Sequence, residues 1–204
     1  AEHAKGFPER DFKEYFQFYP WGRCPESLQA DLASHFAAAV DLGAELLNCI
    51  ARSLPEAVTA ELTEPLRDMI QGSEQSMLRV LHYPPVPTGR SVLRAAPHED
   101  INLLTLLPAA DGPGLELQLR SGEWISVPHS PGQLIVNIGD MLQEATGGYL
   151  PSTPHRVATP DTEQPAVSRM SLPLFLHPRP DVVLSSRYTA RQYLMQRLDE
   201  LGVA

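Results

Sequence analysis

The sequence predicts a mainly β fold, in which helices lead into a jelly-roll-like core and one further helix closes the chain. Three observations support this fold class. Apolar residues recur at helical spacing over residues 27–54. From residue 76 onward, short apolar or alternating runs are separated by turn-rich pieces, which is typical of a sandwich or barrel. Residues 189–201 then carry an apolar stripe, as expected for a terminal helix.

The first helix is expected to begin just after Pro25 and to end before Pro55, because proline cannot continue a helix. Gly43 marks a weak point within it. A second, short helix is predicted over residues 61–71. We expect the long first helix and the terminal helix to pack on one face of the β core.

The strand-rich part begins at residue 76 and is punctuated by glycine and proline. Its predicted strands are residues 77–83, 101–107, 115–119, 124–127, 133–138, 155–158 and 168–176. The pattern therefore divides the chain into a helical segment (1–75), a β core (76–180) and a C-terminal helix (181–204).

Composition excludes several classes of protein. The net charge of −9 argues against nucleic-acid binding, which needs clustered Lys and Arg. No uncharged apolar run approaches the roughly 20 residues that span a bilayer, so no membrane association is expected. Cys24 and Cys49 form no disulfide framework and are interpreted as free thiols, which fits a cytoplasmic location. Nothing in the sequence indicates an oligomeric state.

The triplet His98-Glu99-Asp100 is the first chemically informative feature. Residues two apart on an extended segment point to the same side, so an imidazole and a carboxylate could reach one metal ion. His155, at the start of a predicted strand, is the best candidate for a third ligand. Two histidines and one carboxylate on one face of an octahedron form the facial triad of non-haem Fe(II) oxygenases.

Arg169 lies in the middle of an otherwise apolar predicted strand, and Ser171 follows two residues later. A buried guanidinium needs an anion, and together with a hydroxyl it suits a carboxylate. The alternative is an ion pair with one of the acids of the chain. Phe175 alternates in phase with both residues and should face the same interior, for core packing or substrate contact.

Other polar residues are assigned no chemistry. Asn137 and Asp140 are expected to fix a turn. The remaining histidines lack a second ligand at useful spacing and are interpreted as surface or packing residues. They are His3, His35, His82, His129 and His177.

Several motifs in this order resemble the isopenicillin N synthase-like branch of the iron/2-oxoglutarate-dependent dioxygenases. They cover residues 78–178, about half of the chain. They are His82-Tyr83-Pro84-Pro85, His98-Glu99-Asp100, Leu103-Leu104-Thr105-Leu106-Leu107, Gly122-Glu123-Trp124-Ile125, Val136-Asn137-Ile138-Gly139-Asp140, Thr146-Gly147-Gly148-Tyr149, Ser152-Thr153-Pro154-His155-Arg156-Val157 and Arg169-Met170-Ser171 followed by Phe175.

The resemblance implies a double-stranded β-helix with the metal between two sheets. It implies that His98, Asp100 and His155 bind Fe(II), and that Arg169 and Ser171 hold the far carboxylate of 2-oxoglutarate. Tyr83 matches a tyrosine that hydrogen-bonds this co-substrate in several relatives. Relative to the family, the chain is expected to lack part of the N-terminal region, and residues 159–165 suggest an enlarged hairpin loop.

The expected activity is O2-dependent oxidation, normally hydroxylation, of an unidentified small-molecule substrate, with release of succinate and CO2. Two alternatives stay open. One is a non-haem iron oxidase or cyclase that does not use 2-oxoglutarate and binds a substrate carboxylate with its Arg-x-Ser pair. The other is a jelly-roll binding module without turnover.

Overall fold

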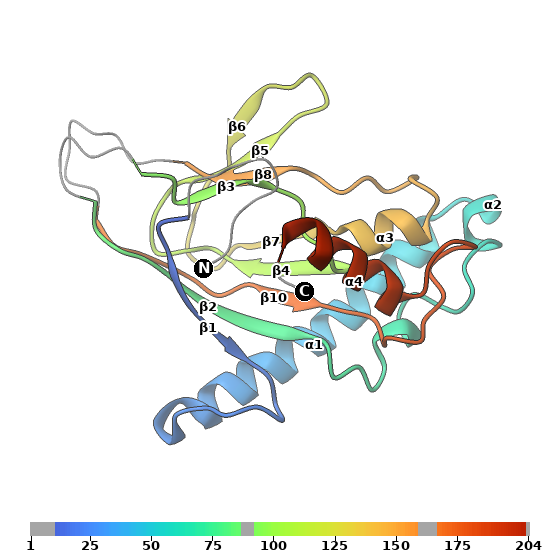
Figure 1. Cartoon of the computed structure of the whole chain (residues 1–204), viewed down its shortest axis with the longest axis horizontal. Helices are drawn as coiled ribbons and strands as arrows, with labels where there is room; N and C mark the ends of the chain where they lie inside the picture. Colours follow the sequence, from blue (N-terminus) through green and yellow to red (C-terminus); the bar gives the residue numbers. More distant parts are fainter. Residues whose placement is uncertain (1–10, 87–91, 159–166, 203–204) are drawn as a thin grey trace.

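The computed structural model describes residues 11–86, 92–158 and 167–202. Within these residues the strands form two antiparallel sheets, one lying over the other (Figure 1). The larger sheet has the order β1 (Glu14–Phe18), β2 (Met77–Tyr83), β10 (Leu174–Leu176), β4 (Leu104–Pro108) and β7 (Leu134–Ile138), and β9 (Arg169–Ser171) also pairs with β2. The smaller sheet has the order β3 (Ala95–His98), β8 (His155–Val157), β5 (Leu115–Gln118) and β6 (Trp124–Ser126).

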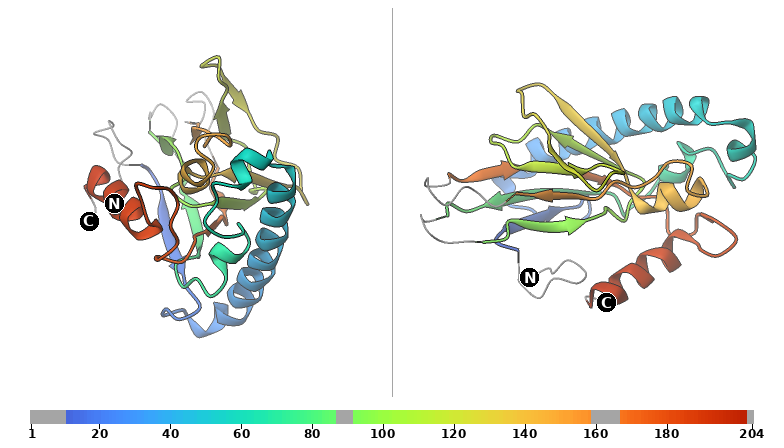
Figure 2. Two further views of the ribbon diagram at one scale, coloured as in Figure 1. Left: turned by 90° about the vertical axis from the view of Figure 1, so that its right-hand side faces the viewer. Right: turned by 90° about the horizontal axis from the view of Figure 1, so that it is seen from above.

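The long helix α1 (Glu26–Ser53) crosses the outer face of the larger sheet (Figures 1 and 2). It follows Pro25 and ends before Pro55, as predicted. The helix continues without a break through Gly43. A Cβ at this position would lie 2.7 Å from Cδ2 of Leu176, so the glycine lets the helix approach β10 closely.

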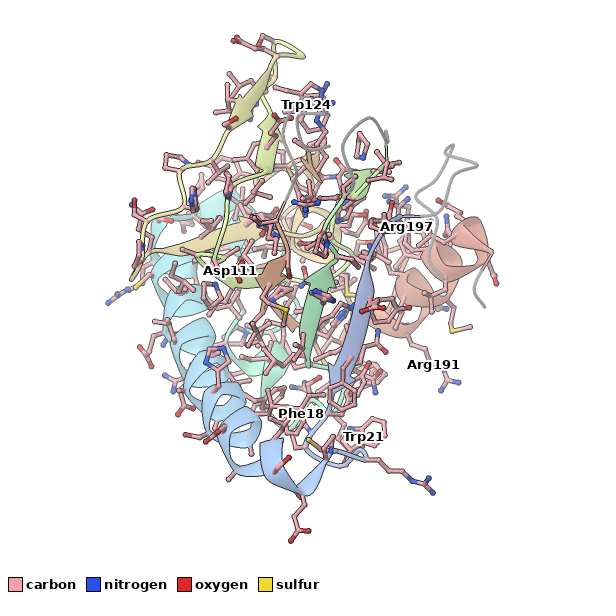
Figure 3. All side chains as sticks on the ribbon, turned by 90° about the vertical axis from the view of Figure 1, so that its left-hand side faces the viewer. Phe18, Trp21, Asp111, Trp124, Arg191 and Arg197 are labelled. Atoms are coloured by element: carbon pink, nitrogen blue, oxygen red, sulfur yellow. The ribbon has the colours of Figure 1, made fainter. Side chains whose placement is uncertain are left out.

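The main hydrophobic core lies between α1 and the larger sheet. Its members include Leu47 of α1, Leu106 of β4 and Leu174 of β10, all almost completely buried. Phe18 at the end of β1 (labelled in Figure 3) meets Phe36 of α1 edge to face, with ring centroids 6.0 Å apart. The main apolar core thus lies on the outer side of the larger sheet.

The inner face of the larger sheet looks toward the smaller sheet. Only a small apolar cluster lies there among the described residues, formed by Leu81, Tyr83, Ala95 and Val157. In β10, Leu174 and Leu176 belong to the main core, so Phe175 between them faces the opposite, inner side, as predicted. The interior between the sheets thus holds apolar side chains together with the polar residues of the candidate site.

The shorter helices are α2 (Glu56–Thr59), the 3-10 turn η1 (Asp68–Ile70), α3 (Asp140–Ala145) and α4 (Ala190–Leu201). Thr189 caps α4 in a capping box with Gln192. Arg197 of α4 (labelled in Figure 3) pairs with buried Asp140 of α3, with Nη2 2.9 Å from Oδ2. No described helix combines the length and apolar character needed to cross a bilayer.

Several sequence-based expectations need correction. The helix predicted over residues 61–71 is wrong, because only η1 is helical there and Pro65 excludes a regular helix across the segment. The strand predicted over residues 168–176 is divided into β9 and β10, with Pro173 between them. Figure 2 shows α1 and α4 on different sides of the strands, and residues of both helices pack against the main core.

Strands β1 and β3 and helix α3 were not predicted as regular elements, although the predicted mainly β class with flanking helices is confirmed. The predicted loop over residues 159–165 lies outside the described residues. Cys24 and Cys49 are both free, as expected.

Candidate metal and co-substrate site

The paired strands β3 and β8 bring two histidines together. His98 ends β3, His155 begins β8, and the two are direct partners in the register. Their ring centroids lie 4.3 Å apart. Asp100 is not on β3 but in the turn that follows, so simple strand alternation does not explain its orientation.

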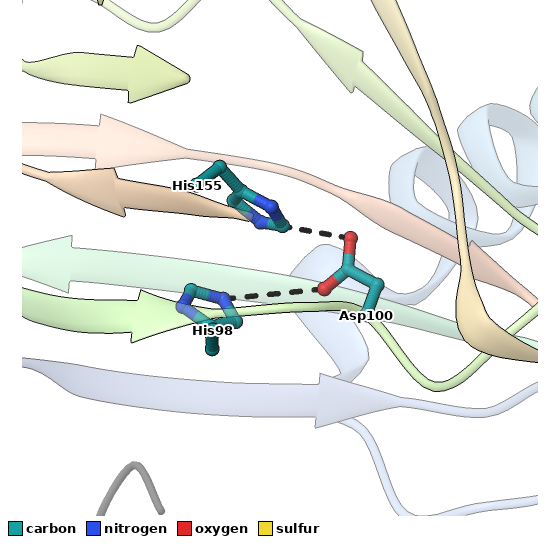
Figure 4. A group of neighbouring side chains, drawn as sticks. All are labelled: His98, Asp100 and His155. Atoms are coloured by element: carbon teal, nitrogen blue, oxygen red, sulfur yellow. Dashed lines mark ion pairs between the residues drawn. The ribbon is translucent and has the colours of Figure 1, made fainter. Parts of the chain in front are cut away.

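Asp100 turns its carboxylate toward both imidazoles (Figure 4). Its Oδ1 is 4.0 Å from Nε2 of His98, and its Oδ2 is 3.7 Å from Nε2 of His155. Two atoms that each lie about 2.1 Å from one ion are at most about 4.2 Å apart, so these separations fit a single ion. One potential ligand atom from each of the three residues lies within 4.8 Å of the others, and no other described residue joins this cluster.

The second nitrogen of each imidazole is held by the backbone. Nδ1 of His98 is 2.8 Å from the carbonyl oxygen of Ala96, and Nδ1 of His155 is 3.1 Å from that of Thr153. A carbonyl can only accept, so Nδ1 carries the proton and Nε2 keeps a lone pair directed at the cluster. This is the tautomer that binds a metal.

Two polar side chains of the larger sheet orient Asp100. Thr105 Oγ1 donates to Oδ2 of Asp100 at 2.6 Å, and Asn137 Nδ2 donates to the same oxygen at 2.8 Å. Thr105 and Asn137 are direct partners in the β4–β7 register, and Asn102 in turn donates to Oγ1 of Thr105 at 2.9 Å. The prediction that Asn137 fixes a turn is therefore wrong, since it lies within β7 and contacts the carboxylate.

The charges of the cluster suit metal binding. Burial, assisted by repulsion from His155, lowers the pKa of His98, so its imidazole is neutral at pH 7. Burial acts to raise the pKa of Asp100, but attraction to the two histidines and the hydrogen bonds that it accepts outweigh burial. The pKa of Asp100 is lowered, and the carboxylate is ionised.

Near this cluster, β2 and β9 bring together the residues expected to bind a carboxylate. Tyr83 is the register partner of Arg169, and Leu81 is that of Ser171. Tyr83, Arg169 and Ser171 are each 4% exposed or less. The guanidinium carbon of Arg169 is 5.2 Å from the ring centroid of Tyr83.

Arg169 is only partly satisfied by the protein. Its Nε donates to the carbonyl oxygen of Gly112 at 3.2 Å, but its buried Nη1 has no hydrogen-bond partner among the described residues. An ion pair with an acid of the chain, the alternative considered from the sequence, is not observed within the described parts. The free guanidinium nitrogen fits a carboxylate ligand.

Comparison with known proteins decides the family. The sequence profile of the 2OG-Fe(II) oxygenase superfamily matches residues 74–178, more than half of the chain. The chain belongs to the 2OG-Fe(II) oxygenase superfamily. The expected cofactors, Fe(II) and 2-oxoglutarate, agree with this membership, and the cluster of His98, Asp100 and His155 offers this family's metal a suitable donor set.

Relatives and solved structures support the same assignment. A candidate oxygenase from Shewanella oneidensis is 51% identical, with a TM-score of 0.87 over 96% of this chain and 73% of that one. Scopoletin 8-hydroxylase of Arabidopsis thaliana is 32% identical over 136 residues, which are 67% of this chain and 36% of that protein. The fold also matches a full-length Neurospora crassa protein in complex with alpha-KG and thymine, at 23% identity and a TM-score of 0.75, over 93% of this chain and 65% of that one.

The chain spans between about a quarter and a half of the length of the curated relatives that it matches. Thr105 and Asn137 were not identified from the sequence as part of the site. A signal for them was present, because each is a lone polar residue within an apolar strand, where an unsatisfied side chain would be costly.

Proposed function

We propose that this oxygenase is an Fe(II)- and 2-oxoglutarate-dependent dioxygenase that hydroxylates a small-molecule substrate. The observation that carries the proposal is the convergence of two imidazoles and one ionised carboxylate, together with a buried guanidinium on the facing sheet that keeps a free nitrogen. The balanced reaction takes up O2 and 2-oxoglutarate and yields hydroxylated substrate, succinate and CO2. A small-molecule substrate is supported by relatives with such names, among them scopoletin 8-hydroxylase.

In this proposal the iron would be held by Nε2 of His98, Nε2 of His155 and a carboxylate oxygen of Asp100. The bound metal with 2-oxoglutarate supplies the oxidation of a C–H bond, coupled to decarboxylation. Thr105 and Asn137 keep one oxygen of Asp100 oriented, which fixes the position of the ion.

Arg169 and Ser171 bind the far carboxylate of 2-oxoglutarate, with Tyr83 beside them. The buried position of all three excludes water, so each charge-assisted hydrogen bond is stronger than it would be in solvent. Phe175 lies on the inner face of β10, where an apolar part of the substrate can contact it.

The direct test is O2-dependent release of succinate from 2-oxoglutarate by the Fe(II)-loaded protein. We expect release in air and none under anaerobic conditions. Absence of succinate with a panel of small aromatic and heterocyclic compounds, while metal still binds, would instead favour an oxidase that does not use 2-oxoglutarate.

Metal binding tests the assignment of the ligands separately. We expect the His98→Ala variant to lose calorimetric binding of Mn(II), whereas His129→Ala, which alters an exposed histidine, retains it. Unchanged Mn(II) affinity in His98→Ala would show that the ion is held elsewhere.

A further inference from the structure

A second buried arginine, Arg94, lies close to the residues proposed to bind the co-substrate. It directly precedes β3, and it is 5% exposed. Its Nη2 donates to the carbonyl oxygen of Val167 at 2.8 Å, two residues before Arg169. Its Nε is buried and has no hydrogen-bond partner in the described parts of the chain. Neither the sequence motifs nor the metal cluster accounts for this side chain.

The start of β9 and the end of β2 place Arg94, Tyr83 and Arg169 together. Tyr83 and Arg169 are register partners, and Arg94 is bonded to the segment that leads into Arg169. The charges of Arg94 and of Tyr83 both act on the pKa of Arg169, which burial lowers. Two guanidiniums and one phenol therefore share a small buried region.

No acid among the described residues forms an ion pair with Arg94 or Arg169. Asp111 is close enough to influence the pKa of Arg169, but its Oδ1 accepts from the backbone nitrogen of Met170 at 2.7 Å. Asp11 pairs with Lys13, with Nζ 2.7 Å from Oδ2. Each arginine thus keeps one buried N–H group without an acceptor among the described residues: Nε in Arg94 and Nη1 in Arg169.

Burying two like charges side by side is unfavourable unless an anion lies between or beside them. A carboxylate offers two oxygens with about four lone-pair sites, so it can accept from two guanidiniums at once. We propose that Arg94 is a second co-substrate-binding residue, and that the far carboxylate of 2-oxoglutarate accepts hydrogen bonds from both Arg94 and Arg169. This inference rests on the proposed function and extends it to a residue outside the recognised motifs.

The test compares 2-oxoglutarate with 2-oxopentanoate, which is also a five-carbon 2-oxo acid but has a methyl group in place of the far carboxylate. Binding of each to the Mn(II)-loaded protein is measured by calorimetry without oxygen. For Arg94→Gln we expect the Kd of 2-oxoglutarate to rise about 10- to 100-fold, as for loss of a charge-assisted hydrogen bond. The Kd of 2-oxopentanoate should change less than about two-fold, because it has no group for Arg94 to bind.

Two further variants complete the experiment. Arg120→Gln, which removes an exposed arginine of the same charge, should leave both dissociation constants unchanged. Arg94→Lys keeps the charge without the guanidinium fork, so it should give an intermediate Kd for 2-oxoglutarate. It also provides a folded variant if Arg94→Gln does not fold.

The outcomes separate this inference from the proposed function. If the Arg94 variants raise the Kd of 2-oxoglutarate and that of 2-oxopentanoate equally, or raise neither, the inference is wrong. Arg94 would then only support the backbone at Val167. If the unaltered Mn(II)-loaded protein fails to bind 2-oxoglutarate, the proposed function itself is wrong.

Discussion

The metal cluster (His98, Asp100 and His155) and the proposed carboxylate site (Tyr83, Arg94, Arg169 and Ser171) differ in how far the protein satisfies its own polar atoms. In the metal cluster, both imidazole Nδ1 atoms bond to carbonyl oxygens, and the carboxylate accepts from Thr105 and Asn137. At the proposed carboxylate site, Arg94 and Arg169 each keep a buried nitrogen without an acceptor among the described residues.

This difference shows two ways of preparing a site. The metal cluster is oriented in advance by its surroundings, so its ligands need little rearrangement when an ion binds. At the proposed carboxylate site two guanidinium nitrogens still lack an acceptor among the described residues, so a bound anion should contribute more to its order. Substitutions in each region test this difference, and the expected effects range from large to small.

The largest effect is expected at Asp100. The Asp100→Asn variant keeps the shape of the side chain but removes the charge that binds the ion and attracts both histidines. We expect Mn(II) affinity to fall by more than the roughly 10- to 100-fold that loss of an outer-shell partner costs. Calorimetry on this variant and on Asp199→Asn, an exposed control, gives the measurement. Full Mn(II) affinity in Asp100→Asn would contradict the assigned ligand set.

A smaller effect is expected at Asn137, whose amide only orients Asp100. In Asn137→Ala the carboxylate of Asp100 still accepts from Thr105. We therefore expect Mn(II) affinity to fall about 10-fold, which is the smaller end of what loss of a residue that orients a ligand costs. Discrimination between 2-oxoglutarate and 2-oxopentanoate should not change, because the side chain of Asn137 bonds to Asp100 and not to a residue of the proposed carboxylate site. Gln29→Ala, on the exposed side of α1, serves as the control. A changed discrimination would mean that the two regions are coupled.

The sequence indicated the metal ligands better than it indicated what supports them. His98, Asp100 and His155 form a residue set with a known chemical use, and the structure brings them within 4.8 Å of one another. The support for Asp100 depends on the pairing of Thr105 with Asn137 across two strands, a register that one sequence does not reveal.

Arg94 was missed for a related reason. No regular element was predicted around Arg94, and its burial arises only when β3 packs near the ends of β2 and β9. The helix predicted over residues 61–71 is wrong because Pro65 interrupts the segment, and only a 3-10 turn forms after it. Local patterns thus identified elements and chemistry, whereas the contacts between distant strands had to be seen in the structure.

The smallest expected effect concerns His177, an imidazole near the cluster that takes no part in it. Burial lowers the pKa of His177 to about 4, while Asp100 acts to raise it and Arg79 to lower it further. No described residue hydrogen-bonds its ring, in contrast to the rings of His98 and His155. Its neutral state thus depends mainly on burial.

A histidine whose pKa is lower in the folded than in the unfolded state stabilises the fold fully above about pH 6.5. That contribution is lost as the pH falls toward 4, because the unfolded chain then binds the proton more readily. The free energy of unfolding of the metal-free protein should fall between pH 7 and pH 5. We expect this fall to be about 1 to 2 kcal/mol larger than the fall in the His177→Gln variant. Urea unfolding at both pH values measures this difference. The titrating groups of the metal cluster are present in both proteins, so their contribution cancels in the comparison. If both proteins lose the same free energy of unfolding between pH 7 and pH 5, His177 is already accessible to protons in the folded state.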